Sequence, residues 1–295
     1  MDNASPSSTI SAQDTGWTLF TLDEQWFALR VNVVIELLNS RGCSITALPS
    51  MPHWAAGVMN HRGRIVPVID LRALMGMPSL SDEVQEIVDM LNTRETDHIN
   101  WLNDLKRCVS TGDEFTKATD PHKCAFGMWY DKLTHDEHAF NEFTDGDLAL
   151  KAVVESFDLH HQRIHELAHK TLAMSKEGKQ DEAIALIDKA WNEDLGALRR
   201  YFETTKTMIT ELRQSQIIVI EQNARAAILV DTINSVRTLD PGQTEPCPMG
   251  IAHEGLISAI YKDDDRLVSL FDTDQFFAST FKELDNTSVN LPEAA

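Results

Sequence analysis

The sequence has few cysteines and no long apolar run. Its four cysteines, Cys43, Cys108, Cys124 and Cys247, are scattered without the spacing of a disulfide framework, so we expect reduced thiols. No segment approaches the run of about 20 apolar residues that a membrane-spanning helix needs. The N-terminus also lacks the basic and apolar regions of a signal peptide. These absences predict a cytoplasmic protein without membrane insertion.

Basic residues are also scarce. The chain has 26 lysines and arginines against 46 acidic residues, so its formal net charge is −20. This excess argues against nucleic acid or an anionic membrane surface as a partner, because both are negatively charged. The apolar content of 42% is ordinary for a folded chain, and the length of 295 residues suggests about two domains.

The pattern of apolar residues changes along the chain. Residues 1–15 are polar and without periodicity, which predicts a disordered tail. Short segments typical of β-strands follow in residues 16–81 and return in residues 214–284, whereas residues 82–213 are helical in period throughout. Residues 285–295 predict a second loose tail.

Four amphipathic segments make up the helical part. Their apolar stripes predict helices near residues 83–109, 121–134, 146–176 and 180–213, with Gly178 at the break between the last two. Four such segments joined by short links are typical of an antiparallel four-helix bundle.

The two β segments resemble each other in sequence. Ala227–Val230 matches Ala28–Val31, and Arg266–Asp272 matches Arg64–Asp70, in the same order along the chain. Such a pseudo-repeat predicts two small β barrels built on one plan. Pro67 predicts that its strand lies at the edge of a sheet, because proline has no N–H to donate.

Three histidines interrupt the apolar stripes of the helical part. His161 and His165 lie four residues apart, so their imidazoles project from one helix face, one turn apart. Both fall within the apolar stripe that runs from Val154 to Leu172, and His98 takes a core position in an earlier segment. A buried imidazole needs partners for its ring nitrogens. Hydrogen bonds within the core would meet that need, and so would a tetrahedral zinc ion shared with Cys124.

The most specific motif in the chain is Cys124-Ala-Phe-Gly-Met-Trp-Tyr130. Together with His98 and the pair of His161 and His165, it resembles the chemoreceptor zinc-binding domain, abbreviated CZB. The resemblance covers roughly residues 82–213. It implies a four-helix bundle that binds Zn²⁺ through three histidines and one cysteine, which here are His98, Cys124, His161 and His165.

A competing motif overlaps the histidine pair. His165-Glu166-Leu167-Ala168-His169 matches the HExxH signature of zinc hydrolases, in which the two histidines bind the metal and the glutamate activates water. A carboxylate such as Glu193 would complete that site. The hydrolase alternative gives no role to His98, Cys124 and His161, whereas the zinc-binding bundle leaves only His169 of these candidates without a role. We therefore favour the bundle, predict that the protein is not an enzyme, and expect His169 to lie off the metal site.

The β segments resemble a second family. The stretch from Phe20 to Leu74 resembles the first half of the CheW-like domain, the coupling module of bacterial chemosensory arrays, and residues 214–284 are similar to its second half. The specific element is the run from Gly57 to Leu71 (Gly-Val-Met-Asn-His-Arg-Gly-Arg-Ile-Val-Pro-Val-Ile-Asp-Leu). This resemblance implies an α+β fold, a CheW-like pair of small five-stranded β barrels interrupted by the inserted four-helix bundle. It also implies an adaptor that bridges the cytoplasmic tip of a chemoreceptor and the regulatory domain of the histidine kinase CheA. Glu36 and Arg62 fall where that family contacts the receptor.

The two resemblances together predict a chemotaxis scaffold that senses zinc itself, or an oxidant such as hypochlorous acid, through Cys124. A zinc-bound cysteine is held as the thiolate, which is the form that oxidants attack, and its oxidation weakens the bond to the metal. The alternative is a passive coupling protein with a purely structural zinc, which is the commoner use of sites with four protein ligands.

Overall fold

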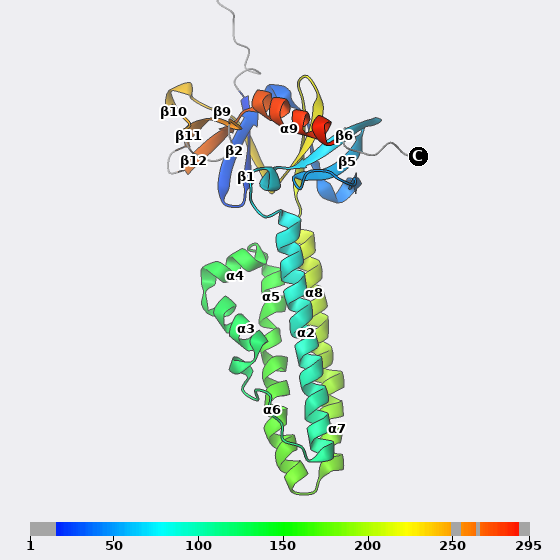
Figure 1. Cartoon of the computed structure of the whole chain (residues 1–295). Helices are drawn as coiled ribbons and strands as arrows, with labels where there is room; N and C mark the ends of the chain where they lie inside the picture. The colour runs from blue at the N-terminus through cyan, green and yellow to red at the C-terminus, as the bar shows by residue number, and fades with distance from the viewer. Residues whose placement is uncertain (1–15, 249–254, 264–265, 289–295) are drawn as a thin grey trace, which may run out of the picture. The chain divides into compact units, whose positions relative to one another are not determined.

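The computed structural model describes three stretches of the chain: residues 16–248, 255–263 and 266–288. The chain forms two compact units (Figure 1). One unit, the β unit, contains the chain up to Ser81 and from Gln214 onward, and the other, the helical unit, contains Asp82–Arg213. Within the described residues, no helix is both long and apolar enough to cross a membrane. The tail predicted over residues 1–15, and residues 289–295 of the second tail, lie outside the described residues.

The β unit is built on two six-stranded sheets. The first sheet has the strand order β10-β11-β12-β2-β1-β9 and contains Gly16–Leu22 (β1), Gln25–Arg30 (β2), Thr232–Thr238 (β9), Thr244–Pro246 (β10), Ile257–Asp263 (β11) and Arg266–Phe271 (β12). The second has the order β3-β7-β8-β6-β5-β4 and contains Val34–Asn39 (β3), Ile45–Thr46 (β4), Ala55–His61 (β5), Arg64–Asp70 (β6), Gln216–Glu221 (β7) and Arg225–Val230 (β8).

The α+β class is confirmed, whereas the expected pair of five-stranded barrels, one from each segment, is not confirmed. Each sheet has six strands and draws them from both segments. The β1–β2 hairpin pairs with β9 and β12, which follow the helical unit in sequence, and the β7–β8 hairpin pairs with β3 and β6, which precede it. The exchange places Phe20 and Phe27 of one hairpin and Ile218 and Ile228 of the other in one shared core.

The sequence repeat reappears in the topology of the sheets. Each sheet consists of three antiparallel strands from one segment, then a hairpin from the other segment, then a single edge strand. In both sheets the hairpin joins the three strands through a parallel pair, β12 with β2 and β6 with β8. The repeat therefore describes strand order, while the exchange of hairpins makes each sheet depend on both segments.

Strand β6 is an interior strand, so the edge position predicted from Pro67 is wrong. Its parallel ladder with β8 begins at Val68, and Pro67 is paired only with Val58 of β5. A proline is tolerated there because it lies outside the parallel ladder, where no N–H is required toward β8.

A helix follows the last strand of each repeat. Leu71–Leu74 (α1) begins after Asp70 and Thr273–Ser288 (α9) begins after Asp272, and each aspartate accepts a hydrogen bond from a backbone N–H in the first turn. The sequence pattern predicts no helix over α9. Its Phe276 is fully buried in the shared core, so tertiary packing stabilises this helix, and the helix extends into the residues expected to begin the C-terminal tail.

A buried ion pair also joins the two segments of the β unit. Arg72 Nε of α1 lies 2.8 Å from Asp231 Oδ1, between β8 and β9, and both side chains are largely buried. Asp231 Oδ2 accepts a further hydrogen bond from the backbone N–H of Asp23 at 2.6 Å. A buried carboxylate needs such partners, because an unpaired buried charge is costly.

The helical unit contains seven α-helices, all within the described residues: Leu80–Thr111 (α2), Ala125–His135 (α3), Glu137–Thr144 (α4), Leu148–Glu155 (α5), Phe157–Lys176 (α6), Gln180–Ala190 (α7) and Gly196–Leu212 (α8). The four predicted segments correspond to α2, α3, α5 with α6, and α7 with α8, whereas α4 is an additional helix. Ser156 separates α5 from α6, a π-helical segment at Trp191–Leu195 joins α7 to α8, and Gly178, at φ +79°, lies at the predicted break. The long helices α2 and α8 run alongside each other (Figure 1), and Lys206 Nζ lies 2.7 Å from Asn92 Oδ1 between them.

An aromatic cluster lies at the centre of the helical core. The rings of Phe126 (α3), Phe157 (α6) and Phe202 (α8) are fully buried and lie 4.7 to 5.5 Å apart between centroids. Such aromatic pairs contribute about 1 kcal/mol each beyond the burial of their area. The cluster fixes α3 against α6 and α8, and it contacts His161, whose ring lies 4.9 Å from that of Phe126.

Candidate metal centre

The structure brings together the four residues predicted as zinc ligands. One potential ligand atom from each of His98, Cys124, His161 and His165 lies within 4.8 Å of the others. His98 is on α2, Cys124 directly precedes α3, and the remaining pair is on α6. Three segments therefore converge on one point. Across the part of the chain that the structure describes, this is the one group of three or more such side chains able to share a metal ion.

Two ring nitrogens in this group lack hydrogen-bond partners. His98 donates its Nδ1–H to the carbonyl oxygen of Arg94 at 2.7 Å, which leaves Nε2 unprotonated. Nε2 of His98 and Nδ1 of His165 are both buried and have no hydrogen-bond partner. Nε2 of His161 lies 3.2 Å from Sγ of Cys124. Because three imidazole nitrogens and one cysteine sulfur form a common zinc donor set, the residues fit Zn²⁺.

Burial keeps the three imidazoles in the form that binds metals. Burial is the main cause that lowers the pKa of His98, and it lowers the pKa of His161 to about 2 and that of His165 to about 4. The neighbouring imidazoles add to the shifts of His161 and His165. Burial also raises the pKa of the Cys124 thiol, so without a cation this cysteine is protonated near neutral pH.

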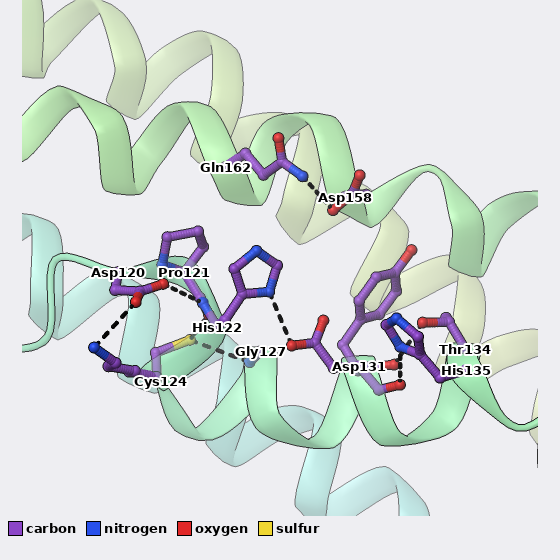
Figure 2. Close-up of polar contacts among 12 residues, drawn as sticks. Asp120, Pro121, His122, Cys124, Gly127, Asp131, Thr134, His135, Asp158 and Gln162 are labelled. Carbon is purple, nitrogen blue, oxygen red and sulfur yellow. Dashed lines mark hydrogen bonds and ion pairs between the residues drawn. The ribbon is translucent and has the colours of Figure 1, made fainter.

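Cys124 is held in place as the N-cap of helix α3. The 3-10 turn Pro121–Lys123 precedes it, and Sγ of Cys124 accepts a hydrogen bond from the backbone N–H of Gly127 at 3.1 Å (Figure 2). Asp120 caps the turn by accepting a hydrogen bond from the N–H of His122 at 3.0 Å. The helix therefore begins at Ala125, later than the start predicted at residue 121, because the cap and the turn occupy the intervening residues.

The other distinctive residues of the Cys124–Tyr130 motif have structural roles. Gly127 has no room for a side chain, because a Cβ atom there would overlap the backbone carbonyl of Pro121. Phe126 belongs to the buried aromatic cluster, and Tyr130 stacks on it with ring centroids 5.5 Å apart. The motif thus combines a candidate ligand with the contacts that orient it.

Two side chains outside the predicted set anchor the loop that carries Cys124. His122 Nδ1 lies 2.9 Å from Asp131 Oδ2 of α3 (Figure 2), and this hydrogen bond is the main cause that raises the pKa of His122. The indole N–H of Trp101 donates to the carbonyl oxygen of Ala118 at 2.8 Å. Loop contacts of this kind have no periodic signal in the sequence, so pattern reasoning did not identify them.

The HExxH arrangement is not assembled. Of its two histidines, only His165 joins the buried group, whereas His169 and Glu166 are exposed. Glu193 is exposed too and lies 3.8 Å from Lys189. His169 lies away from the metal group because it follows His161 by eight residues, which is more than two helical turns further along α6.

The two residues predicted to contact partners lie next to each other in the β unit. Arg62 occupies the β5–β6 turn with φ +53° and a side chain that is 68% exposed, and its Nη2 lies 3.0 Å from Glu36 Oε2. The same oxygen of Glu36 lies 2.8 Å from Nε2 of His61, which is buried. These two hydrogen bonds, first that to His61, lower the pKa of Glu36. Arg62 is therefore the accessible member, while Glu36 is 27% exposed and already paired.

Comparison with known proteins matches two families to this chain. The CheW-like domain matches residues 17–97 and 195–281, and the chemoreceptor zinc-binding domain matches residues 98–172. Among curated proteins, the chain is 35% identical over 69 residues to "Chemotaxis protein CheW" of Thermotoga maritima, and 32% identical over 87 residues to "Probable chemotaxis protein CheW" of Rhizobium etli. These alignments cover 23% and 29% of this chain and 44% and 54% of those proteins, so the chain spans about half the length of the curated relatives it matches.

Among solved structures, the scaffolding protein TtCheW from Thermoanaerobacter tengcongensis aligns with 88% of this chain and 89% of its own, with 15% identity and a TM-score of 0.39. The CheW-like match alone spans more than half of the 295 residues. The chain therefore belongs to the CheW-like family, and a chemoreceptor zinc-binding domain, whose cofactor is Zn²⁺, lies between the two parts of its CheW-like domain.

Proposed function

We propose that this protein is a chemotaxis signalling adaptor that couples chemoreceptors to the histidine kinase CheA and senses zinc or an oxidant through Cys124. Family membership supports the coupling role, and the matched relatives are named as chemotaxis proteins CheW. One observation carries the sensing role: a cysteine sulfur shares a buried group with three imidazoles, of which His98 and His165 each have a ring nitrogen without a hydrogen-bond partner.

Each residue of the group has a defined part in this proposal. His98 offers Nε2, because its Nδ1–H is bonded to a backbone carbonyl. His161 and His165 offer nitrogens from adjacent turns of α6, and Cys124 offers Sγ at the start of α3. Bound zinc supplies the positive charge that holds the cysteine as its thiolate, the nucleophilic form.

The proposed signal begins at the sulfur of Cys124. With hypochlorous acid, a bond forms between Sγ and oxygen while the O–Cl bond breaks; sulfur loses two electrons and chloride leaves. The sulfenic acid lacks the negative charge of the thiolate and is a weaker donor, so it also weakens the hold on the metal. Because α2, α3 and α6 each contribute to the group, loss of one donor loosens the packing of three helices.

Short chain connections offer a path from the helical unit to the β unit. Helix α8 ends at Leu212 and β7 begins at Gln216, while α2 begins at Leu80, shortly after α1. A change in the packing of α2 and α8 therefore acts on segments that lead directly into one sheet, because β6 and β7 both belong to it, and α1 carries the ion pair to Asp231, directly before β9 of the other sheet.

A structural zinc is the second candidate, and one observation favours it. The group already provides four protein donors, which leaves no open coordination position, as is typical of structural sites. In that case the bundle would be stiffened by zinc, and the protein would couple receptor and kinase passively.

The deciding experiment treats the zinc-loaded protein with one equivalent of hypochlorite. Zinc release is followed with a chromogenic chelator, and kinase activity is assayed in reconstituted receptor arrays. If Cys124 is the sensor, the wild type should release zinc and change its kinase output. The control variant Cys43→Ser, which lacks a thiol of the β unit, should respond like the wild type. Cys124→Ser should start with less zinc and show no further response. If the wild type retains its zinc and its kinase output is unchanged, the sensing role is excluded and the structural role of zinc remains.

Arg62 and Glu36 are proposed as contacts to the receptor or kinase. Arg62→Ala should weaken pull-down of receptor or kinase without unfolding, because exposed substitutions usually change stability by less than about 0.5 kcal/mol. Arg64→Ala is the matched control, since Arg64 is equally exposed at 68% and lies two residues away. Glu36→Lys should act more strongly, because it also removes the partner of buried His61. If Arg62→Ala binds receptor and kinase as well as Arg64→Ala does, Arg62 is not a partner contact.

A further inference from the structure

A buried histidine lies next to the proposed partner contact of the β unit. His61 is the last residue of β5 and is 4% exposed. It continues the inward face of that strand two residues after Met59, which belongs to an apolar cluster of the second sheet. A histidine at such a position needs a partner for each ring nitrogen, because an unpaired buried polar atom is costly. Both nitrogens have one, and the two partners lie on different strands.

The two partners fix the tautomer of the ring. Nδ1 of His61 lies 3.2 Å from Nη1 of Arg225 on β8. A guanidinium group can only donate, so Nδ1 accepts this hydrogen bond and carries no proton. The ring proton is therefore on Nε2, which lies 2.8 Å from Oε2 of Glu36 on β3 and donates to it. The hydrogen bonds thus run in one direction, from Arg225 through His61 to Glu36.

This chain of hydrogen bonds joins strands that do not pair with each other. In the second sheet β3 and β5 are separated by β7, β8 and β6, so Glu36 and His61 meet only because the sheet curls. Arg225 is held in turn by Glu221 of β7, whose Oε2 accepts a hydrogen bond from its Nη2 at 2.7 Å. The carboxylate of Glu36 is therefore positioned relative to two interior strands, β7 and β8.

Arg62 has a backbone conformation that its residue type disfavours. It is the first residue of the two-residue turn between β5 and β6, and its φ is +53°. Such turns favour asparagine or aspartate before the glycine. The turn gains support from Asn60, whose Oδ1 accepts a hydrogen bond from the N–H of Gly63 at 2.8 Å. An arginine at a position that its backbone disfavours indicates a role for its side chain.

Glu36 connects the buried histidine to this exposed side chain. Its Oε2 lies 2.8 Å from Nε2 of His61 and 3.0 Å from Nη2 of Arg62, so one oxygen accepts both hydrogen bonds. His61 thus fixes the atom to which Arg62 is bound. An exposed arginine without such an anchor moves among several rotamers, and ordering it on binding costs affinity.

We propose that His61 is a positioning residue of the partner contact: through Glu36 it holds the guanidinium group of Arg62 in one orientation before a partner binds. For its effect on binding, this inference rests on the proposed contact between Arg62 and receptor or kinase. The positioning itself is measurable in the protein alone, because it concerns the mobility of the Arg62 side chain.

Three substitutions separate the two ends of the ring. His61→Gln keeps an N–H donor near the place of Nε2, so it should retain the hydrogen bond to Glu36. His61→Asn keeps an acceptor near the place of Nδ1 for Arg225, but its shorter amide does not reach Glu36. His61→Leu removes both hydrogen bonds. His61→Asn keeps the proposal testable if His61→Leu folds poorly.

The first measurement follows the mobility of the Arg62 side chain in the full-length protein by nuclear magnetic resonance relaxation of its Nε. Arg64 is the internal control, because it is equally exposed at 68% but is bound to Glu221 instead of Glu36. The order parameter at Arg62 should fall in His61→Asn and His61→Leu and stay near that of the wild type in His61→Gln. Arg64 should be unchanged in all three. Unchanged mobility of Arg62 in His61→Asn and His61→Leu would overturn the proposal.

The second measurement determines the Kd for a receptor fragment and for CheA, with each variant made both in the wild type and in Arg62→Ala. We expect about fivefold weaker binding in His61→Asn and His61→Leu, rescue in His61→Gln, and no further loss where Arg62 is already alanine. An equal loss in both backgrounds would show that His61 only stabilises the sheet, and would overturn the proposal. If Arg62 becomes mobile as expected but Arg62→Ala binds like the wild type, the partner contact fails while the positioning by His61 stands.

Discussion

Replacing Cys124 by serine or by alanine separates its two roles in this structure. Sγ of Cys124 caps helix α3 by accepting the N–H of Gly127 at 3.1 Å, and it also belongs to the buried candidate metal group. Serine keeps an oxygen acceptor at the cap but is a poor zinc donor, whereas alanine removes both functions. The two variants should therefore lose zinc alike but differ in the stability of α3.

The magnitude of that difference follows from the cap alone. Loss of an N-cap acceptor costs about 1 kcal/mol, which is about a fivefold change in the opening equilibrium of the helix start. In the zinc-free protein, Cys124→Ala should therefore increase the exchange rate of the Gly127 amide about fivefold over wild type, and Cys124→Ser should stay close to wild type. In zinc-containing buffer, only the wild type should gain further protection at this amide.

Amide hydrogen exchange resolved at Gly127, combined with zinc analysis of each purified variant, provides the measurement. Equal exchange in Cys124→Ser and Cys124→Ala would show that Sγ does not cap the helix. Wild-type zinc content in Cys124→Ser would show that the sulfur is not a ligand. Cys43→Ser is the control for the loss of a thiol elsewhere, and it should change neither quantity.

Three further predictions concern the fold around the site. Gly127→Ala should lower the free energy of unfolding by about 1–3 kcal/mol and reduce zinc content, because the new methyl group meets a backbone carbonyl; Gly196→Ala, which meets no atom closer than 3.7 Å, should be neutral or stabilising in the same thermal unfolding assay. Arg72→Met should lower the free energy of unfolding of the β unit, measured in urea, by about 3–5 kcal/mol, because it leaves the carboxylate of Asp231 buried without its cation. A loss of stability no larger than that of an exposed substitution would contradict this prediction. The zinc-free protein should lose stability as the pH falls from about 6.5 toward 4, because the pKa of His165 is lowered to about 4 in the folded state and the unfolded chain takes up its proton first. Protonation of His165 alone should lower the free energy of unfolding by on the order of 3 kcal/mol over this range. Equal urea midpoints at neutral pH and at about pH 4.5 would refute this prediction.

Local patterns predicted the helical unit well. The 3.6-residue period and the four-residue spacing of His161 and His165 depend only on helix geometry, so both histidines were expected on one buried face, and both are found there. Helix α4 was not predicted, and the start of α3 was predicted too early, because the cap at Cys124 is a feature of one turn of chain and not of a periodic stripe.

The arrangement of the β unit required the tertiary structure. The short runs at residues 17–22 and 26–31, on either side of Asp23-Glu24-Gln25, are typical of a hairpin, and the β1–β2 hairpin is present. The sheet that this hairpin joins was not predictable in this way, because residues 18–20 and 27–29 are buried in succession on both faces of their strands, and such short apolar runs can pair with many partners. The shared core, which includes Phe20, Phe276 and Ile228, decided in favour of exchanged hairpins.

The helical register was thus enough to predict that His98, His161 and His165 are buried, while the resemblance to the chemoreceptor zinc-binding domain implied that Cys124 joins them. The tertiary structure alone decided that His98 Nε2 and His165 Nδ1 lack hydrogen-bond partners, that His169 stays outside, and that Gly127 packs against the turn before Cys124. These features arise from contacts between segments far apart in the chain, and a local pattern carries no record of the partners that such segments meet when they pack.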